Sequence, residues 1–403
     1  MRKYLIAGGW TAGIAAAQRL RALDPSSDIT VVEAEPELYY ARPDLIDYIA
    51  GRKTRNQLMM HDLAWYTENR ISLVQAHRVQ SIAPQNHQAT LDDGTLLSYD
   101  RLLLSNGASP FVPPLPGANE PGVFTLRTLS DADSMLERIA PGQNVVIVGG
   151  GVLGLEVARA FTERGMTATV IENSGRLLSR QLDQASADML ADHLHGLGIT
   201  AFLNAECEEI TVRDHQATGV LIKDGRSASG AFVLLSTGVR PNLALAKEAG
   251  IATGRGVQVD DSLQTSAPDV YAAGDVIEHR SRLYGIIPPC LEQARIAAQN
   301  MFVPGSATYE GSVMSNSLKT CGVEVLSMGN VNPTEDQHLQ TIVARGDGVY
   351  RKIVLDGGTL VGVILYGTTA GARQLQQAMR SAADVTRFQE QLADIDWDCS
   401  EMS

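Results

Sequence analysis

Residues 145–154 read VVIVGGGVLG, and this stretch decides the fold of the chain. Its first four residues are apolar, as is typical of a buried strand, and they run directly into a glycine-rich turn. The apolar pattern of residues 155–164 predicts a helix, and residues 168–171 predict a second strand that leads into Glu172. Strand, glycine turn, helix, strand and acid make a βαβ unit with parallel strands.

The same order of elements occurs nearer the N-terminus. Residues 4–13 read YLIAGGWTAG, a helix is predicted over residues 14–23, and the next apolar run ends at Glu33. A second shared element follows each unit, because LLSNGASP at 103–110 matches LLSTGVRP at 234–241. The chain therefore contains two α/β modules of one design, with a proline-rich linker between them.

The downstream glycine motif is complete. Gly149, Gly151 and Gly154 fit the pattern G-x-G-x-x-G, which is typical of dinucleotide-binding turns. The first glycine makes the tight turn, the second lets the backbone approach a pyrophosphate, and the third lets helix and strand pack closely. Glu172 lies 18 residues after Gly154, where a carboxylate can accept a hydrogen bond from a ribose 2′-hydroxyl. Because that carboxylate would repel a 2′-phosphate, the motif favours NADH over NADPH.

The upstream motif departs from this pattern at one position. Gly8 and Gly13 are present, and Glu33 follows Gly13 by 20 residues, but Trp10 stands where the second glycine belongs. A Cβ there takes space that a pyrophosphate needs, and an indole takes much more. Either the ring turns outward and shields the phosphates, or it fills part of the dinucleotide channel. A nucleotide fold that no longer binds its ligand is the alternative interpretation.

Composition limits the classes of partner. The 403 residues carry 33 Lys+Arg and 46 Asp+Glu, a formal net charge of −13, which disfavours a broad surface for nucleic acid or anionic membranes. No run of about 18 apolar residues predicts a membrane span, and the first residues read as a strand, not as a signal peptide. The four cysteines show no C-x-x-C pattern, so we expect free thiols in a cytoplasmic protein. The eight histidines form no obvious metal site, and no metal is predicted.

The region after residue 309 has a different pattern. Alternating runs predict strands, among them a hairpin whose turn is Asp356-Gly357-Gly358. Helical segments are expected over residues 370–392, and the acidic tail from residue 394 is expected to fray.

In its ordered set of motifs the chain resembles the FAD-dependent pyridine nucleotide-disulfide oxidoreductase superfamily. The branch it resembles most contains NADH:rubredoxin oxidoreductase and the flavin-containing front part of the nitrite reductase large subunit. The resemblance covers nearly the whole chain. Besides the two glycine motifs, it rests on YARP at 40–43 with Leu45, YDRLLL at 99–104 before Asn106-Gly107, GVFTLRT at 122–128, STGVRP at 236–241, AAGD at 272–275, and Leu318-Lys319 followed by Gly322.

The resemblance implies an α/β fold with two Rossmann-like dinucleotide-binding domains. The FAD domain is discontinuous, the NAD domain is inserted into it, and a small C-terminal α+β domain follows. The expected boundaries are 1–112 and 241–308 for the FAD-binding domain, 113–240 for the NAD-binding domain and 309–403 for the C-terminal domain.

The resemblance also assigns residues to the two cofactors, FAD and NADH. It implies that Gly8, Gly13 and Glu33 contact the pyrophosphate and ribose of FAD, and that Asp275 binds the ribityl chain. Four further residues are implied to line the flavin or the nicotinamide: Arg42, Pro43, Arg127 and Glu156. For the last two, an interior ion pair is the alternative interpretation.

Thiol chemistry at the flavin is not expected. The disulfide branches of the superfamily use a C-x-x-x-x-C pair, and the coenzyme A disulfide reductase and NADH peroxidase branches use one cysteine near residues 40–45. This chain has no cysteine before Cys207. For Cys290 we expect an inert thiol, and a minor redox role is the alternative interpretation. An acidic partner could dock on the basic cluster at residues 52–55, for which a solvated loop is the alternative.

The resemblance implies an enzyme that passes electrons from NADH through FAD to a small redox protein such as rubredoxin, as a monomer or homodimer. Two alternatives remain. One is an NADH oxidase or diaphorase that reduces oxygen or a quinone. The other is a nucleotide-binding protein with reduced catalysis, for which Trp10 is the motive.

Overall fold

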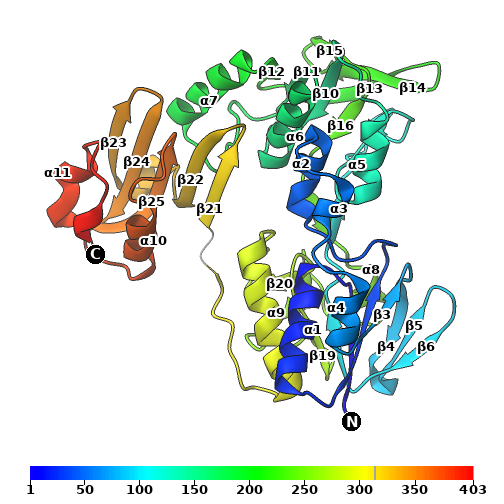
Figure 1. The fold of residues 1–403 in the computed structure, drawn as a ribbon. Coiled ribbons are helices and arrows are strands. Elements are labelled where there is room, and N and C mark those ends of the chain that lie inside the picture. Colours follow the sequence, from blue (N-terminus) through cyan, green and yellow to red (C-terminus); the bar gives the residue numbers. More distant parts are fainter. Residues whose placement is uncertain (313–314, 403) are drawn as a thin grey trace. The chain divides into compact units, whose positions relative to one another are not determined.

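A computed structural model describes residues 1–312 and 315–402. The chain forms two compact units, each built from several segments. Unit 1 comprises Met1–Asp44, Lys53–Ser109 and Val239–Ser312, and unit 2 comprises Leu45–Arg52, Pro110–Gly238 and Val313–Ser403. Each unit contains one of the two parallel sheets that the glycine motifs predict, which confirms the repeated α/β design (Figure 1).

The main sheet of unit 1 has five parallel strands in the order β19-β7-β1-β2-β3. Their bounds are β1 Lys3–Ala7, β2 Asp28–Glu33, β3 Ile71–Gln75, β7 Arg101–Leu104 and β19 Val270–Ala272. β1 and β7 are apolar and buried along most of their length, as expected for strands covered on both faces. Because β19 pairs with β7, a strand from late in the chain completes the sheet of the first glycine motif.

Two long helices of unit 1 lie side by side in Figure 1. They are α1 (Thr11–Leu23) and α9 (Ile287–Phe302), and both bury alanines, which let the two backbones approach closely. The smaller elements of this part of the chain are α3 Arg55–Leu58, α4 Leu63–Glu68, β4 Val79–Ala83, β5 Gln88–Leu91, β6 Leu96–Ser98, β8 Ala108–Pro110, β17 Val239–Pro241, α8 Ala244–Glu248, β18 Val257–Val259 and β20 Ile277–His279.

Unit 2 repeats the design with the parallel sheet β12-β11-β10-β16-β9. The strands are β9 Val123–Phe124, β10 Asn144–Val148, β11 Thr167–Ile171, β12 Ile199–Phe202 and β16 Val233–Leu235. Helix α6 (Val152–Glu163) follows β10 in the way that α1 follows β1. The other elements here are α2 Leu45–Ala50, α5 Leu129–Leu136, α7 Gln184–Gly196, β13 Cys207–Arg213, β14 Gln216–Ile222 and β15 Ser227–Ser229.

The C-terminal part of unit 2 is an antiparallel sheet with helices, as the α+β prediction required. The strand order is β21-β22-β25-β24-β23, and the turn Asp356-Gly357-Gly358 joins β24 to β25 as predicted. The elements are β21 Ser315–Thr320, β22 Val323–Gly329, β23 Gln340–Gly346, β24 Val349–Asp356, β25 Thr359–Tyr366, α10 Ala372–Arg380 and α11 Gln389–Leu392.

The prediction of a frayed tail is wrong. Cys399 is fully buried, and the tail is held by the fully buried Arg351 of β24. The Arg351 guanidinium donates to the carbonyl oxygens of Asp394 (2.8 Å), Ile395 (3.4 Å) and Trp397 (2.6 Å). An arginine presents several donors in a fixed geometry, so one side chain can hold several carbonyls of an irregular segment. The described part of the tail, residues 394–402, therefore belongs to the domain, and Ser403 lies outside the described residues.

Candidate functional site

The two glycine turns have matching geometry. Gly8 has φ +109°, and a Cβ there would lie 2.3 Å from a carbonyl oxygen just beyond β7. Gly149 has φ +115°, and a Cβ there would lie 2.2 Å from a carbonyl oxygen just beyond β16. A Cβ on Gly13 would lie 1.9 Å from the Gly8 oxygen, and one on Gly154 would lie 2.1 Å from the Gly149 oxygen. The first and third glycines of both motifs therefore exclude any side chain, and the turns bring each helix N-terminus close to its sheet.

The acid of each module is held beside its glycine turn. Oε2 of the buried Glu33 accepts the amide of Gly9 at 2.6 Å, and Oε2 of Glu172 accepts the amide of Gly150 at 2.7 Å. In each case the other carboxylate oxygen accepts the amide two residues further along the chain. A carboxylate has about four acceptor positions, so these backbone bonds leave room for a ribose hydroxyl. Both acids fit the roles that the sequence predicts for them.

The second motif leaves space on the side where a pyrophosphate would approach. At Gly151, the N-cap residue of α6, a Cβ would meet no atom of the described residues within 4 Å. The following amides form the N-terminus of a twelve-residue helix, which favours an anion. The turn fits a dinucleotide.

Trp10 takes the matching N-cap position of α1. Its half-buried indole lies edge-on to the ring of Tyr40, with the ring centroids 4.4 Å apart, and 5.9 Å from the ring of Tyr39. Cζ of Arg42 lies 4.2 Å from the indole centroid, within the range of a cation–π interaction. The indole thus contacts the loop of residues 39–42.

Arg42 belongs to a polar cluster that includes a residue the motif search missed. It forms an ion pair with Glu35, whose other oxygen accepts the Tyr40 hydroxyl at 2.9 Å. Burial raises the pKa of Glu35 above its ordinary value, and the nearby Arg42 lowers it in part. Pro43 follows Arg42 in a short 3₁₀ turn. Glu35 belongs to no sequence motif, because its partner Arg42 lies on a different element.

Asp275 follows a glycine turn at the end of β19. Gly274 has φ +88°, and a Cβ there would lie 3.1 Å from Cβ of Ala12 and 3.3 Å from Sγ of Cys290. The turn that carries Asp275 therefore lies against the first turn of α1 and the first turns of α9. Within unit 1 the fold brings the glycine turn, Glu33, Arg42 and the Asp275 turn to the N-terminal end of α1.

Within unit 2, Glu156 contacts the turn between β21 and β22 of the C-terminal sheet. Its Oε1 accepts the amide of Cys321 at 2.6 Å, and Nε2 of His193 lies 3.0 Å from the Cys321 carbonyl oxygen. Burial raises the pKa of Glu156. The Cys321 thiol is also buried, and its Sγ lies 3.2 Å from the carbonyl oxygen of Leu155. Sequence motifs did not point to Cys321, because its partners on α6 and α7 are far away in the chain.

Arg127 lies just before α5, also in unit 2. Its backbone amide donates to Oδ2 of Asp131 at 2.8 Å, and the Thr128 amide donates to the same oxygen. These bonds belong to the N-terminal cap of α5 and give the segment a local structural role.

The basic residues at 52–55 are all paired with acids. Arg52 pairs with Asp47 and with Glu163. The remaining pairs are Lys53 with Asp44 at 2.6 Å and Arg55 with Glu37 at 3.0 Å. Local neutralisation weakens the case for electrostatic steering of an acidic partner to this segment.

Three possible metal ligands come together on the surface of unit 1, although no metal was predicted. They are His77, Asp92 and Asp93, and Nδ1 of His77 lies 2.9 Å from Oδ1 of Asp92. The hydrogen bond accounts for the arrangement without an ion.

All four cysteines are free, in agreement with the expected thiols. Among the described residues, no helix is both long and apolar enough to cross a membrane.

Comparisons with known proteins agree with this geometry. Residues 2–300 match the family described as pyridine nucleotide-disulphide oxidoreductase, and residues 315–383 match the rubredoxin NAD+ reductase C-terminal domain. The chain is 35% identical to the nitrite reductase [NAD(P)H] of Bacillus subtilis over 386 residues, which is 96% of this chain but 48% of that protein. It is 32% identical to the NADH-rubredoxin oxidoreductase of Clostridium acetobutylicum over 329 residues, 82% of each chain.

Among solved structures, a ferredoxin reductase for the CYP199A2 system from Rhodopseudomonas palustris superposes with a TM-score of 0.90 at 26% identity. The match covers 100% of this chain and 99% of that one. The chain spans about half the length of the first nitrogen-metabolism relatives that it matches, 48% and 51% of each.

Proposed function

The chain belongs to the pyridine nucleotide-disulphide oxidoreductase family, and on that premise we propose that it is an FAD-dependent NADH:acceptor oxidoreductase. In this proposal electrons pass from NADH through FAD to a small redox protein such as rubredoxin. The observation that carries the proposal is the pair of glycine turns of matching geometry, each with a carboxylate bonded to its backbone, Glu33 in unit 1 and Glu172 in unit 2. Two such turns in one chain fit two dinucleotides.

We assign FAD to unit 1. Gly8 makes the tight turn and Gly13 lets α1 pack close to β1, which directs the N-terminus of α1 to the pyrophosphate. Glu33 accepts from the ribose, Asp275 faces the ribityl chain, and Arg42 with Pro43 lines the flavin. The support is the clustering of these residues around the N-terminus of α1. Bound flavin would supply the hydride and single-electron chemistry, which no side chain provides.

We assign NADH to the glycine turn of unit 2. Gly149, Gly151 and Gly154 shape the turn, and the N-terminus of α6 favours the phosphates. Glu172 selects NADH, because its carboxylate accepts from the ribose hydroxyls and repels a 2′-phosphate. Glu156 and Arg127 lie in the same unit and are the candidates for contacts near the nicotinamide and flavin.

A small redox protein is the acceptor that the relatives favour. The C-terminal match to a rubredoxin reductase domain and the similarity to NADH-rubredoxin oxidoreductase support it. The chain lacks a cysteine in the loop of residues 39–42, so the reduced flavin would have no thiol there to relay electrons. The free cysteines support a reducing compartment, and we propose the cytoplasm.

Spectroscopy of the purified full chain tests this function. We expect a flavin absorbance band that bleaches when NADH is added without oxygen, and that returns when oxidised rubredoxin is added. Recovery with oxygen or a quinone but not with rubredoxin or ferredoxin would instead establish an oxidase or diaphorase. A chain that does not bind FAD after reconstitution would contradict the proposal.

A further inference from the structure

The backbone amide of Gly274, next to Asp275, begins a buried chain of hydrogen bonds. Gly274 N donates to Oε1 of Gln293 at 3.0 Å, and Nε2 of Gln293 donates to the Tyr309 hydroxyl at 3.1 Å. Gln293 is a fully buried residue of α9, and Tyr309 is fully buried in the segment that leads from α9 toward the C-terminal sheet. One glutamine side chain therefore connects the turn of Asp275 to this segment.

The last two hydrogen bonds of this series determine which group donates in each of the others. The Tyr309 hydroxyl lies 2.8 Å from Oγ of Ser312, which donates to Oε2 of Glu292 at 2.6 Å. A carboxylate only accepts, so the single hydroxyl proton of Ser312 points to Glu292 and Tyr309 must donate to Ser312. Burial raises the pKa of Tyr309 to about 12, so its hydroxyl keeps the proton at neutral pH.

This direction fixes the side-chain amide of Gln293. The Tyr309 oxygen accepts, so it faces the amide nitrogen of Gln293, and the amide oxygen faces the Gly274 N–H. The reversed amide would place two N–H donors against each other at Gly274 in a fully buried site. Aligned hydrogen bonds in series also strengthen one another.

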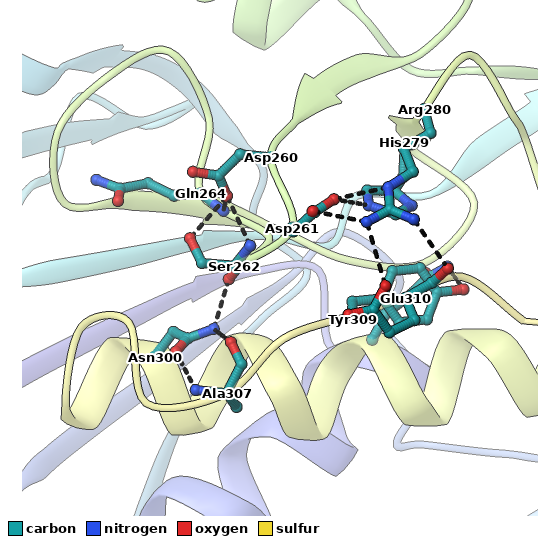
Figure 2. Close-up of polar contacts among 11 residues, drawn as sticks. Asp260, Asp261, Ser262, Gln264, His279, Arg280, Asn300, Ala307, Tyr309 and Glu310 are labelled. Carbon is teal, nitrogen blue, oxygen red and sulfur yellow. Dashed lines mark hydrogen bonds and ion pairs between the residues drawn. The ribbon is translucent and has the colours of Figure 1, made fainter.

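Other contacts also fix the position of Tyr309 in the series of hydrogen bonds (Figure 2). The Tyr309 amide donates to the carbonyl oxygen of Asp261 at 2.7 Å, and its ring lies 4.8 Å from that of the buried His279. The Asp261 carboxylate accepts both from His279 and from Arg280. Further along α9, Asn300 donates to the carbonyl oxygens of Ser262 and Ala307, each at 2.8 Å.

We propose that Gln293 and Tyr309 are positioning residues that hold the Gly274–Asp275 turn in the conformation that binds FAD. The inference rests on the proposed function, because it assigns Asp275 to FAD. Gly274 has φ +88°, a conformation that few residues adopt, and its amide donates to an acceptor outside the turn. Gln293 supplies that acceptor. It acts through Asp275 and does not itself touch the ligand.

The test is FAD affinity of apoprotein made from the full chain, measured by quenching of FAD fluorescence, beside the thermal stability of the same apoprotein. In Gln293→Leu the Gly274 amide loses its acceptor, and we expect the FAD dissociation constant to rise about tenfold. Tyr309→Phe keeps the ring and removes one hydroxyl, and we expect about a threefold rise. Gln293→Glu keeps an acceptor for Gly274 but loses the donor to Tyr309, so its affinity should lie between those of Gln293→Leu and the wild type.

Asn300→Leu is the matched control, because Asn300 is equally buried on α9 and holds the same segment without bonding the Gly274 turn. It should lower the melting temperature of the apoprotein but change FAD affinity less than twofold. Wild-type affinity in Gln293→Leu, or an equal loss in Asn300→Leu, would overturn the inference. If Gln293→Leu does not fold, the comparison of Tyr309→Phe with Asn300→Leu decides the question in the same way. Failure of the wild type to bind FAD would overturn the proposed function itself.

Discussion

The guanidinium of Arg42 lies over the indole of Trp10, with Cζ 4.2 Å from the ring centroid. The same guanidinium pairs with Glu35, so the cation is held between an aromatic face and a carboxylate. Trp10 is the residue that breaks the first glycine motif, and Arg42 is a candidate to line the flavin. The residue that departs from the motif therefore contacts a candidate flavin-lining residue, and both lie at the N-terminal end of α1.

We expect Trp10→Gly to bind FAD more tightly than the wild type. A side chain that crowds a binding site costs ~1–3 kcal/mol, whereas the lost cation–π contact with Arg42 is worth about 0.5–1 kcal/mol. The difference is at most about 2.5 kcal/mol, which corresponds to at most about a sixtyfold gain in affinity. The wild type should therefore carry less than one FAD per chain after dialysis, as measured by absorbance. Weaker binding by Trp10→Gly would show that the indole is a favourable contact.

Glu172 should set the preference for NADH. Glu172→Gln removes the charge that repels a 2′-phosphate, and we expect the ratio of kcat/KM for NADH to that for NADPH to fall about tenfold, as for the loss of about 1.4 kcal/mol. Steady-state rates with both nucleotides measure this ratio. Glu33→Gln is the matched control in unit 1, where it should weaken FAD and leave the nucleotide ratio unchanged. A wild type that prefers NADPH would contradict the assignment.

Cys290 should not carry electrons. Its Sγ lies beside the Gly274 turn, but no second cysteine lies in the loop of residues 39–42 to complete a relay. We expect Cys290→Ser to reduce an artificial acceptor with NADH at a rate within about twofold of the wild type, since serine keeps nearly the same volume. Stopped-flow absorbance of the flavin measures the rate. Complete inactivation of Cys290→Ser would establish a redox role for this thiol.

Glu156 should make stability depend on pH. Burial raises its pKa in the folded protein above the ordinary value of 4.5, with smaller opposing effects of the Cys321 amide and Arg159. A raised pKa means that its contribution to stability is complete below pH 4.5 and is lost as pH rises through the folded-state value. Glu156→Gln keeps an acceptor for Cys321 and cannot ionise. The melting temperature of Glu156→Gln minus that of the wild type should increase by ~2 °C between pH 4 and pH 8. A difference in melting temperature that does not change with pH would contradict this prediction.

Arg351 should be essential to the C-terminal tail. Lysine has one ammonium in place of the planar guanidinium and cannot reach three carbonyl oxygens at once. We expect Arg351→Lys to destabilise the C-terminal domain by ~2 kcal/mol, because buried carbonyls lose their donor. Chemical unfolding and limited proteolysis of the tail would measure the loss. Arg345→Lys, at an exposed position of β23, is the control and should change little.

The sequence alone was sufficient for the two dinucleotide turns. Gly8 and Gly149 are required locally by φ values of +109° and +115°, and Gly13 and Gly154 by the carbonyl oxygen of the glycine five residues earlier. Short-range steric rules connect such a pattern to one conformation, so strand, turn, helix and acid could be predicted in both modules. The hairpin at residues 356–358 was predictable for the same reason, since its turn residues and flanking strands are adjacent in the chain.

Only the tertiary structure decided which distant residues meet. The pairs Arg42–Trp10, Glu156–Cys321 and Gly274–Gln293 join different elements, and no local pattern marks the two residues of a pair as neighbours. The tail shows the same limit, because its acidic composition suggested a frayed end, while a buried arginine on β24 holds its carbonyls. Local sequence determines φ, ψ and strand direction. These contacts depend instead on how packed elements bring buried hydrogen-bond donors to acceptors. A buried backbone donor needs an acceptor, and only the tertiary fold decides which residue provides it.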